Sequence, residues 1–124
     1  MKRTCKQVLE HMIEHCKDIA DAVSRVKTVE GMDADNLIRK AIVFSILDLG
    51  ELTKLLEKFI SLSDSKINWK GLKGMREIAA HRYKSMDSEI VWNVAIYDMP
   101  EIYIYLSDKY KNLSSVQLAA TCDE

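Results

Sequence analysis

The sequence predicts an all-α protein, folded as an up-and-down antiparallel bundle of about four to five helices. Proline occurs once and glycine four times in 124 residues, so few positions interrupt a helix. No segment longer than a few residues alternates apolar and polar side chains, as a half-buried strand would. Apolar residues make up 48% of the chain, enough to fill one core. We therefore expect a single helical domain over residues 1–113.

The first helix is expected to begin at Thr4, which forms a capping-box pattern with Gln7. Apolar residues then follow at steps of three and four and make one stripe: Val8, Met12, Cys16, Ile19, Val23 and Val26. The sequence EGMD at residues 30–33 predicts a break. There, Gly31 suits a helix C-terminus and Asp33 suits the next N-cap.

A second helix is predicted from about residue 34 to residue 60, and it is apolar on more than one face. Its apolar residues are Leu37, Ile38, Ala41, Ile42, Ile46, Leu49, Leu52, Leu55, Leu56, Phe59 and Ile60. Such a helix lies at the centre of a bundle or at a subunit interface.

Three shorter helices complete the expected fold. Asn68 is the predicted N-cap of a helix from Trp69 to about Tyr83, and Asp87 or Ser88 caps the next. The sequence YDMPE predicts a break before a last helix from Pro100 to about Leu113, because proline disfavours helix in the preceding residue. Residues 114–124 have little to bury and are expected to fray.

The charge balance limits the classes of partner. With 18 basic and 19 acidic residues, the chain has no overall positive field to hold nucleic acid. No apolar run is as long as a membrane span, and the first residues lack the apolar centre of a secretory signal. We expect a cytoplasmic protein with no membrane partner.

The cysteines and two of the histidines give little sign of a metal or a disulfide. The three cysteines are widely spaced and have no CxxC pattern, which favours reduced thiols. His11 and His15 are four residues apart and Cys16 follows, a spacing that could hold a metal ion. No further ligand has a suitable spacing, and Cys16 falls in the apolar stripe. The sequence therefore predicts no metal ligands and no cofactor.

The stretch GMREIAAHRY at residues 74–83 carries the residues best suited to chemistry. An arginine such as Arg76 binds phosphate oxygens in two places, and a histidine such as His81 transfers protons near neutral pH. Together they suffice for metal-independent RNA cleavage. Tyr83 could orient the substrate, act as a nucleophile or accept a modification. Four nearby cations offer a local patch for RNA: Lys70, Lys73, Arg82 and Lys84.

Helix geometry leaves another interpretation open. Arg76 and His81 are five residues apart, so a regular helix points them roughly 140° away from each other. A site then requires the helix to end near His81, or a twofold dimer to supply the partner. The alternative is that both are surface residues, with Arg76 paired to Glu77 or another carboxylate, and that the basic patch is a solvated face.

The stretch resembles the signature of the HepT-like HEPN family, the toxin half of HEPN/MNT toxin–antitoxin modules. In this signature an arginine is followed by four residues, a histidine, one residue and a tyrosine, which here are Arg76, His81 and Tyr83. Three further segments are similar to that family: INWKGLKGMR at 67–76, SEIVWNVAIYDMPEI at 88–102, and the Gly50-Glu51 pair in the second helix. The likeness spans roughly residues 5 to 110.

The resemblance implies a homodimeric HEPN bundle and a metal-independent endoribonuclease, neutralised by a cognate MNT nucleotidyltransferase that adds AMP to Tyr83. Arg76 would then bind the phosphate and His81 would be the acid or base. The intact motif favours this function, whereas two departures, Glu77 and the KSMDSE segment after Tyr83, leave room for an alternative. This is an inactive HEPN subunit that binds substrate or nucleotide for the nucleotidyltransferase. A plain helical interaction module is the third hypothesis.

Overall fold

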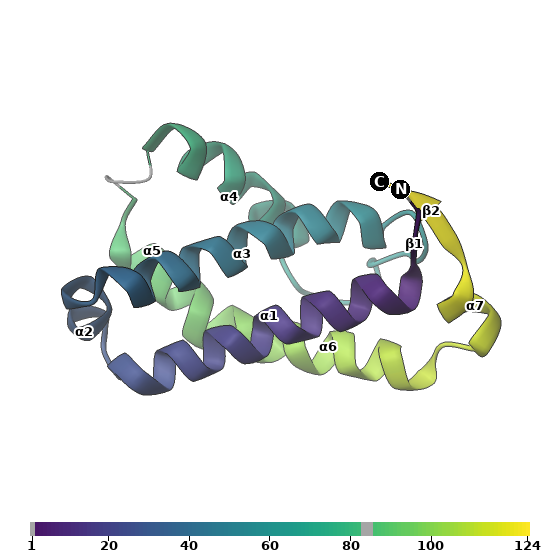
Figure 1. Cartoon of the computed structure of the whole chain (residues 1–124), viewed down its shortest axis with the longest axis horizontal. Helices are drawn as coiled ribbons and strands as arrows, with labels where there is room; N and C mark the ends of the chain where they lie inside the picture. Colours follow the sequence, from purple (N-terminus) through teal and green to yellow (C-terminus); the bar gives the residue numbers. More distant parts are fainter. Residues whose placement is uncertain (1, 83–85) are drawn as a thin grey trace.

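The long helices lie side by side along the molecule (Figure 1). The computed structural model describes residues 2–82 and 86–124, without the side chains of residues 80–82. Helix α1 (Cys5–Val26) packs against both α3 (Asn36–Leu56) and α6 (Met99–Asn112). Helix α4 (Trp69–Arg82) covers α3 on its other side. Consecutive long helices run in opposite directions, so the predicted all-α, up-and-down fold is confirmed.

The start of α1 follows the prediction. Thr4 Oγ1 accepts a hydrogen bond from the Gln7 N–H at 3.0 Å, and Gln7 Oε1 accepts one from the Thr4 N–H at 2.9 Å. The predicted end was wrong. Lys27 closes α1 in the left-handed region, with φ 68°, and its N–H donates to the Val23 carbonyl. Gly31 instead lies within a short helix, α2 (Val29–Ala34).

The predicted N-cap and length of the second helix also change. Asp35, not Asp33, caps α3, and its Oδ1 accepts from the Ile38 N–H at 3.2 Å. Helix α3 ends at Leu56 and not at residue 60, because the hydrogen-bond pattern changes over the next residues. The Phe59 N–H donates to the Leu56 carbonyl at 2.9 Å, a bond that belongs to a tighter turn than an α-helix.

The predicted caps of the following helices are confirmed. Asn68 Oδ1 accepts from the Gly71 N–H at 2.9 Å, at the start of α4. Asp87 caps α5 (Ser88–Asn93) by accepting from the Glu89 N–H.

The predicted break before Pro100 was wrong. The chain stays helical through a π-helical turn, η2 (Val94–Asp98), directly into α6. Pro100 lies in the first turn of α6, where its missing N–H is tolerated.

The chain termini meet in a small antiparallel sheet. Strand β1 (Lys2–Thr4) pairs with β2 (Thr121–Asp123), in the register Arg3 opposite Cys122. The sequence predicts a frayed tail over 114–124, whereas the structure forms α7 (Ser115–Ala119) and then β2 there. Periodicity misses this segment because its order comes from a capping box of Ser114 with Gln117 and from pairing with the other end of the chain.

The core lies where α1, α3 and α6 meet. Its fully buried side chains include Leu9, Met12, Ile19, Ile42, Ile46, Leu49, Ile102 and Leu106. In the described part of the chain, no helix is both long and apolar enough to cross a membrane.

Candidate functional site

The candidate site begins with a close approach of α4 to α3. Gly50 is buried on α3, and a Cβ atom added there would lie 2.7 Å from the Leu72 carbonyl oxygen of α4. Only glycine allows the two backbones to come this close. Leu72, Met75 and Ala79 form the buried stripe of α4. The residue after Met75 therefore stands at the edge of the contact between the two helices.

That residue is Arg76, and its partner comes from α3. Arg76 Nη1 lies 2.9 Å from Glu51 Oε1, and Lys54 Nζ lies 3.1 Å from the same oxygen. These two hydrogen bonds, from Lys54 first and from Arg76, hold the pKa of the Glu51 carboxyl below its ordinary value. The Arg76 side chain is 60% exposed, so a ligand can reach it from solvent. The pair holds one terminal nitrogen of the guanidinium and leaves the other N–H groups for a further partner.

The sequence singled out Gly50-Glu51 only as part of a resemblance and assigned the pair no role. The structure assigns one to each residue: Gly50 admits α4, and Glu51 pairs with Arg76. One prediction from the sequence pairs Arg76 with Glu77 or another carboxylate. In the structure the partner is Glu51.

The other residues of the motif are only partly placed. The backbone of His81 and Arg82 is helical and belongs to α4, which is described as far as Arg82. Their side chains, and Tyr83 and Lys84 entirely, lie outside the described residues.

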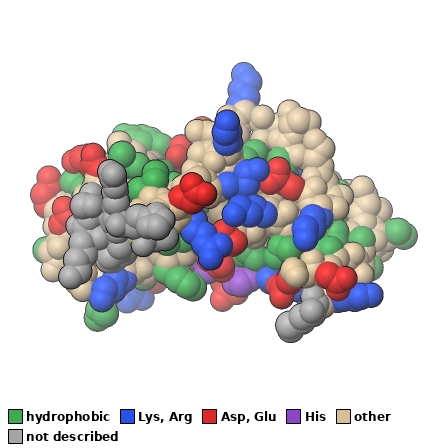
Figure 2. Space-filling model, turned by 90° about the horizontal axis from the view of Figure 1, so that it is seen from above, with side chains coloured by type: hydrophobic (Ala, Val, Ile, Leu, Met, Phe, Trp, Pro, Cys, Tyr) green, Lys and Arg blue, Asp and Glu red, His purple; other side chains and the backbone are tan. Residues whose placement is uncertain are grey.

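The predicted RNA contacts Lys70 and Lys73 line a groove of about 780 Å³ at the start of α4. Lys58 from the end of α3 lines the same groove. Lys73 Nζ lies 2.8 Å from Glu57 Oε1, so its charge is partly balanced. Figure 2, seen from the α4 side, shows lysine and arginine side chains interspersed with acidic ones. Among the described side chains, the surface therefore offers separate positive charges within two turns of Arg76, interspersed with acidic ones.

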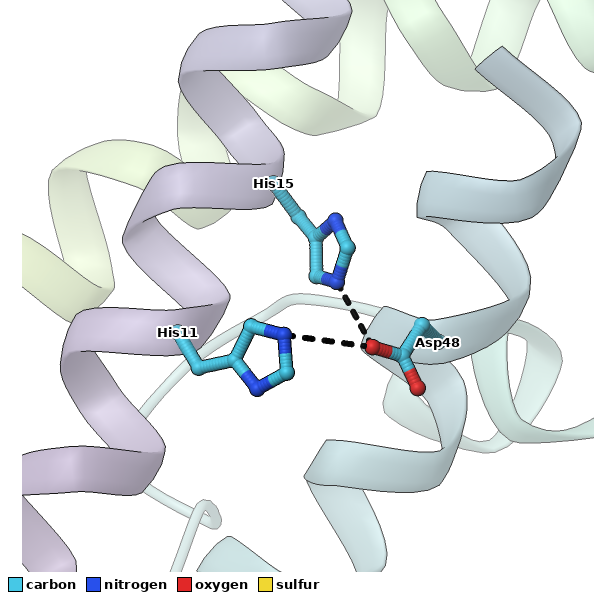
Figure 3. Close-up of side chains that lie close together, drawn as sticks. All are labelled: His11, His15 and Asp48. Atoms are coloured by element: carbon cyan, nitrogen blue, oxygen red, sulfur yellow. Dashed lines mark hydrogen bonds and ion pairs between the residues drawn. The ribbon is translucent and has the colours of Figure 1, made fainter. Parts of the chain in front are cut away.

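A second cluster joins α1 to α3 (Figure 3). His15 Nε2 lies 2.7 Å from Asp48 Oδ2, and His11 Nε2 lies 3.5 Å from the same oxygen. The sequence identified the two histidines, but it missed Asp48, which is 33 residues beyond His15. Cys16, the third residue that the sequence considered, instead points into the core, where burial raises the pKa of its thiol to about 12.

Comparison with known proteins gives one family and several relatives. A family model described as "Ribonuclease HepT-like" matches residues 12–108. "Putative RNase TTE0752" of Caldanaerobacter subterraneus subsp. tengcongensis is 29% identical over 81% of this chain and 88% of its own length. "Putative RNase MJ1216" of Methanocaldococcus jannaschii is 32% identical over 82% of this chain and 83% of its own. "Putative RNase MJ0125", also of M. jannaschii, is 31% identical over 82% and 86%. No solved structure matches the chain significantly.

Proposed function

Because this chain belongs to the HepT-like family of HEPN-type ribonucleases, we propose that it is a metal-independent endoribonuclease and the toxin of a HEPN/MNT toxin–antitoxin module. The observation that carries the proposal is the ion pair of Arg76 with Glu51. It holds an exposed arginine side chain one helical turn along α4 from Lys73, which lines the groove. A planar cation held in this way is suited to bind a phosphate of RNA.

The proposed reaction needs only a base, an acid and a cation. The ribose 2′-oxygen forms a bond to the adjacent phosphorus while the bond from phosphorus to the 5′-oxygen breaks. His81 takes the proton of the 2′-hydroxyl or delivers one to the departing 5′-oxygen. Arg76 stabilises the negative charge that grows on the phosphoryl oxygens. The products are a 2′,3′-cyclic phosphate and a 5′-hydroxyl.

Glu51 is the positioning residue of this mechanism. Its carboxylate holds Arg76 by one nitrogen, and the remaining N–H groups of the guanidinium are left for phosphate. The same negative charge also opposes the approach of RNA. Glu51 is therefore expected to improve the placement of Arg76 at some cost in RNA affinity.

The proposed homodimer would use the outer face of α3. Leu37 and Phe44 are seven residues apart and are 79% and 64% exposed, and Ala41 between them is exposed too. Residues seven apart share a helix face, so Glu51 continues the line of Leu37 and Phe44. A twofold dimer through this apolar stripe would bring two Arg76–Glu51 pairs toward one shared cleft.

The proposed control of the toxin acts on Tyr83. A cognate nucleotidyltransferase would transfer AMP from ATP to the tyrosine oxygen and release pyrophosphate. Tyr83 is seven residues from Arg76 in the sequence. An AMP group in this motif would add negative charge beside the arginine and compete with the RNA phosphate.

Cleavage of total cellular RNA in EDTA tests the proposal. Wild-type protein is expected to cut, and Arg76→Ala and His81→Ala are each expected to lose about a hundredfold or more of the rate. Arg25→Ala is the matched control, because Arg25 is an exposed arginine near the far end of α1 and pairs only with Asp21 among the contacts described. Circular dichroism must show that all variants are folded.

The assay separates the ribonuclease from the inactive subunit. Loss of cleavage in both motif variants, with the control active, supports the ribonuclease. Equal inactivity of all four proteins, with wild type free of AMP by mass spectrometry, overturns it for the RNAs tested. The inactive subunit that binds substrate or nucleotide for the nucleotidyltransferase then takes its place.

A further inference from the structure

We propose that His11, His15 and Asp48 form a binding site for one divalent transition-metal ion of the zinc class. The proposal goes beyond the ribonuclease and does not rest on it. Each of the three residues offers a ligand atom, and these atoms all lie within 4.8 Å of one another. Two come from α1 and one from α3, and both imidazole rings direct a nitrogen at the same carboxylate oxygen of Asp48 (Figure 3).

The chemistry of the ligands selects the class of ion. Two imidazole nitrogens and one carboxylate oxygen suit Zn²⁺, Co²⁺ or Ni²⁺, whereas Mg²⁺ and Ca²⁺ prefer an all-oxygen set. The two histidines are four residues apart, so they share one face of α1. Three protein ligands leave a fourth position for water. The set therefore matches an open zinc site and not a closed structural one.

The three ligands differ in how far their side chains are exposed to solvent. The His15 side chain is 8% exposed, while those of His11 and Asp48 are 38% and 30% exposed. An ion could therefore enter from solvent past two ligands and reach a third that packing holds in place. Figure 2 shows histidine at the surface, among acidic and basic side chains.

Ser45 provides the outer contact that such a histidine needs. Its Oγ lies 3.2 Å from His15 Nδ1, on the side of the ring away from Asp48. When the Nδ1–H donates to this hydroxyl, the Nε2 lone pair is free for a metal. Without an ion, a proton lies between Nε2 and Asp48 Oδ2. On binding, that proton would leave Nε2, for Nδ1 or for solvent, and the ion would take its place. The 2.7 Å separation of Nε2 and Oδ2 would widen to about 3.3 Å, the spacing of two ligands on tetrahedral zinc.

Arg3 is expected to weaken metal binding, because it stabilises the form of His11 that carries its proton on Nε2. Its Nη2 lies 3.0 Å from His11 Nδ1, and a guanidinium only donates, so the His11 proton is on Nε2. Metal binding at Nε2 moves that proton to Nδ1, where it faces Arg3. Arg3 must then release His11, and it retains a second partner, Glu124 Oε1 at 3.1 Å.

The test is a titration of tag-free, metal-stripped protein with Zn²⁺ by calorimetry and with Co²⁺ by visible absorption. We expect one ion per chain. Removing a ligand in His11→Ala or Asp48→Asn should weaken binding by about tenfold to a hundredfold or more. Arg3→Gln should tighten it several-fold, because an amide can accept from the Nδ1–H. Cys16→Ala is the matched control, expected to bind as wild type does, since its thiol is in the core.

Two results would overturn the site. One is the absence of a one-to-one zinc complex with folded wild-type protein. The other is equal affinity in wild type, His11→Ala and Asp48→Asn, each confirmed to be folded. In either case the cluster is only a set of hydrogen bonds that joins α1 to α3. Neither result bears on RNA cleavage, which is measured separately in EDTA.

Discussion

Arg76 is held by a carboxylate that lies 25 residues earlier in the sequence, on another helix. Neither the charge pattern of α4 nor the spacing of the motif indicates Glu51 as this partner. The pair matters because a guanidinium on a long side chain loses several rotamers when it is fixed. Because Glu51 lies on a packed helix, it already restricts the rotamers of Arg76, so less conformational entropy is lost when RNA binds.

Replacing Glu51 with glutamine tests this positioning role. We expect Glu51→Gln to lower kcat for RNA cleavage by about tenfold or more, because a displaced catalytic group loses rate steeply. The KM should stay the same or fall, because a negative charge beside the phosphate is gone. Steady-state kinetics with a short fluorogenic RNA separate the two parameters.

The control for that measurement is Glu30→Gln, the same charge change at an exposed residue of α2. It should leave both constants unchanged. A rise in KM with unchanged kcat in Glu51→Gln would show that the carboxylate does not position Arg76 for the chemical step.

At the scale of elements, the contact of α3 with α4 depends on one glycine. Gly50→Ala places a methyl group 2.7 Å from the Leu72 carbonyl, so the helix backbones must separate. We expect a loss of about 1–3 kcal/mol in the free energy of unfolding, despite the better helix propensity of alanine. Cleavage should fall as well, since Arg76 moves with α4. Urea unfolding and the RNA assay measure the two effects.

Gly74→Ala is the matched substitution on α4. Among the described residues, no atom outside the neighbouring backbone of α4 lies within 4 Å of a Cβ added there, and the residue is exposed inside a helix. Alanine should therefore stabilise the protein by about 0.5–1 kcal/mol. If the two substitutions had equal effects, the close approach at Gly50 would have no energetic importance.

The loop between α3 and α4 is joined to α6 by Asp64. Its Oδ2 accepts from Lys109 Nζ, and its Oδ1 accepts from the Tyr105 hydroxyl, each at 2.6 Å. These bonds, that of Lys109 first, hold the pKa of the Asp64 carboxyl below its ordinary value. The stabilisation is therefore complete above about pH 4, the carboxyl pKa of the unfolded chain. It is lost as the pH falls through the lower pKa of the folded state.

Asp64→Asn tests this linkage by urea unfolding at several pH values. We expect the variant to be less stable than wild type near neutral pH and the difference to shrink in acid, as Asp64 itself becomes protonated. Asp108→Asn, an exposed aspartate on α6, is the control and should show a smaller pH-dependent difference. A wild-type minus Asp64→Asn difference that stayed constant with pH would exclude a contribution from the charged carboxylate.

At the scale of the whole molecule, the proposed dimer predicts that two inactive variants complement each other. If Arg76 of one copy acts with His81 of the other, an Arg76→Ala/His81→Ala mixed dimer retains one complete site. After subunits are exchanged in equal amounts, half of the dimers are mixed, so about a quarter of wild-type activity should return. Native mass spectrometry would measure the fraction of mixed dimers.

Subunit exchange without any return of cleavage would place Arg76 and His81 of one site in the same chain. The absence of any dimer would remove the basis for a shared cleft. Substituting Phe44 with a charged residue provides an independent check, because the exposed apolar stripe of α3 is the proposed interface.

Local patterns in the sequence were enough for the fold class and for most helix starts. The capping box at Thr4 and the caps at Asn68 and Asp87 depend on residues two or three positions apart, so the sequence displays them directly. The ends of helices were harder. Lys27 in the left-handed region and the π-helical turn before Pro100 depend on packing more than on residue type.

What the sequence by itself determined is therefore the all-α bundle and the candidate residues of one short motif. Only the tertiary structure decided which residues become neighbours: Glu51 with Arg76, and Asp48 with His11 and His15. The physical reason is that helix periodicity and capping act over a few residues. Contacts between helices depend on how close two backbones can pack, and at α3 and α4 a single glycine at residue 50 sets that distance.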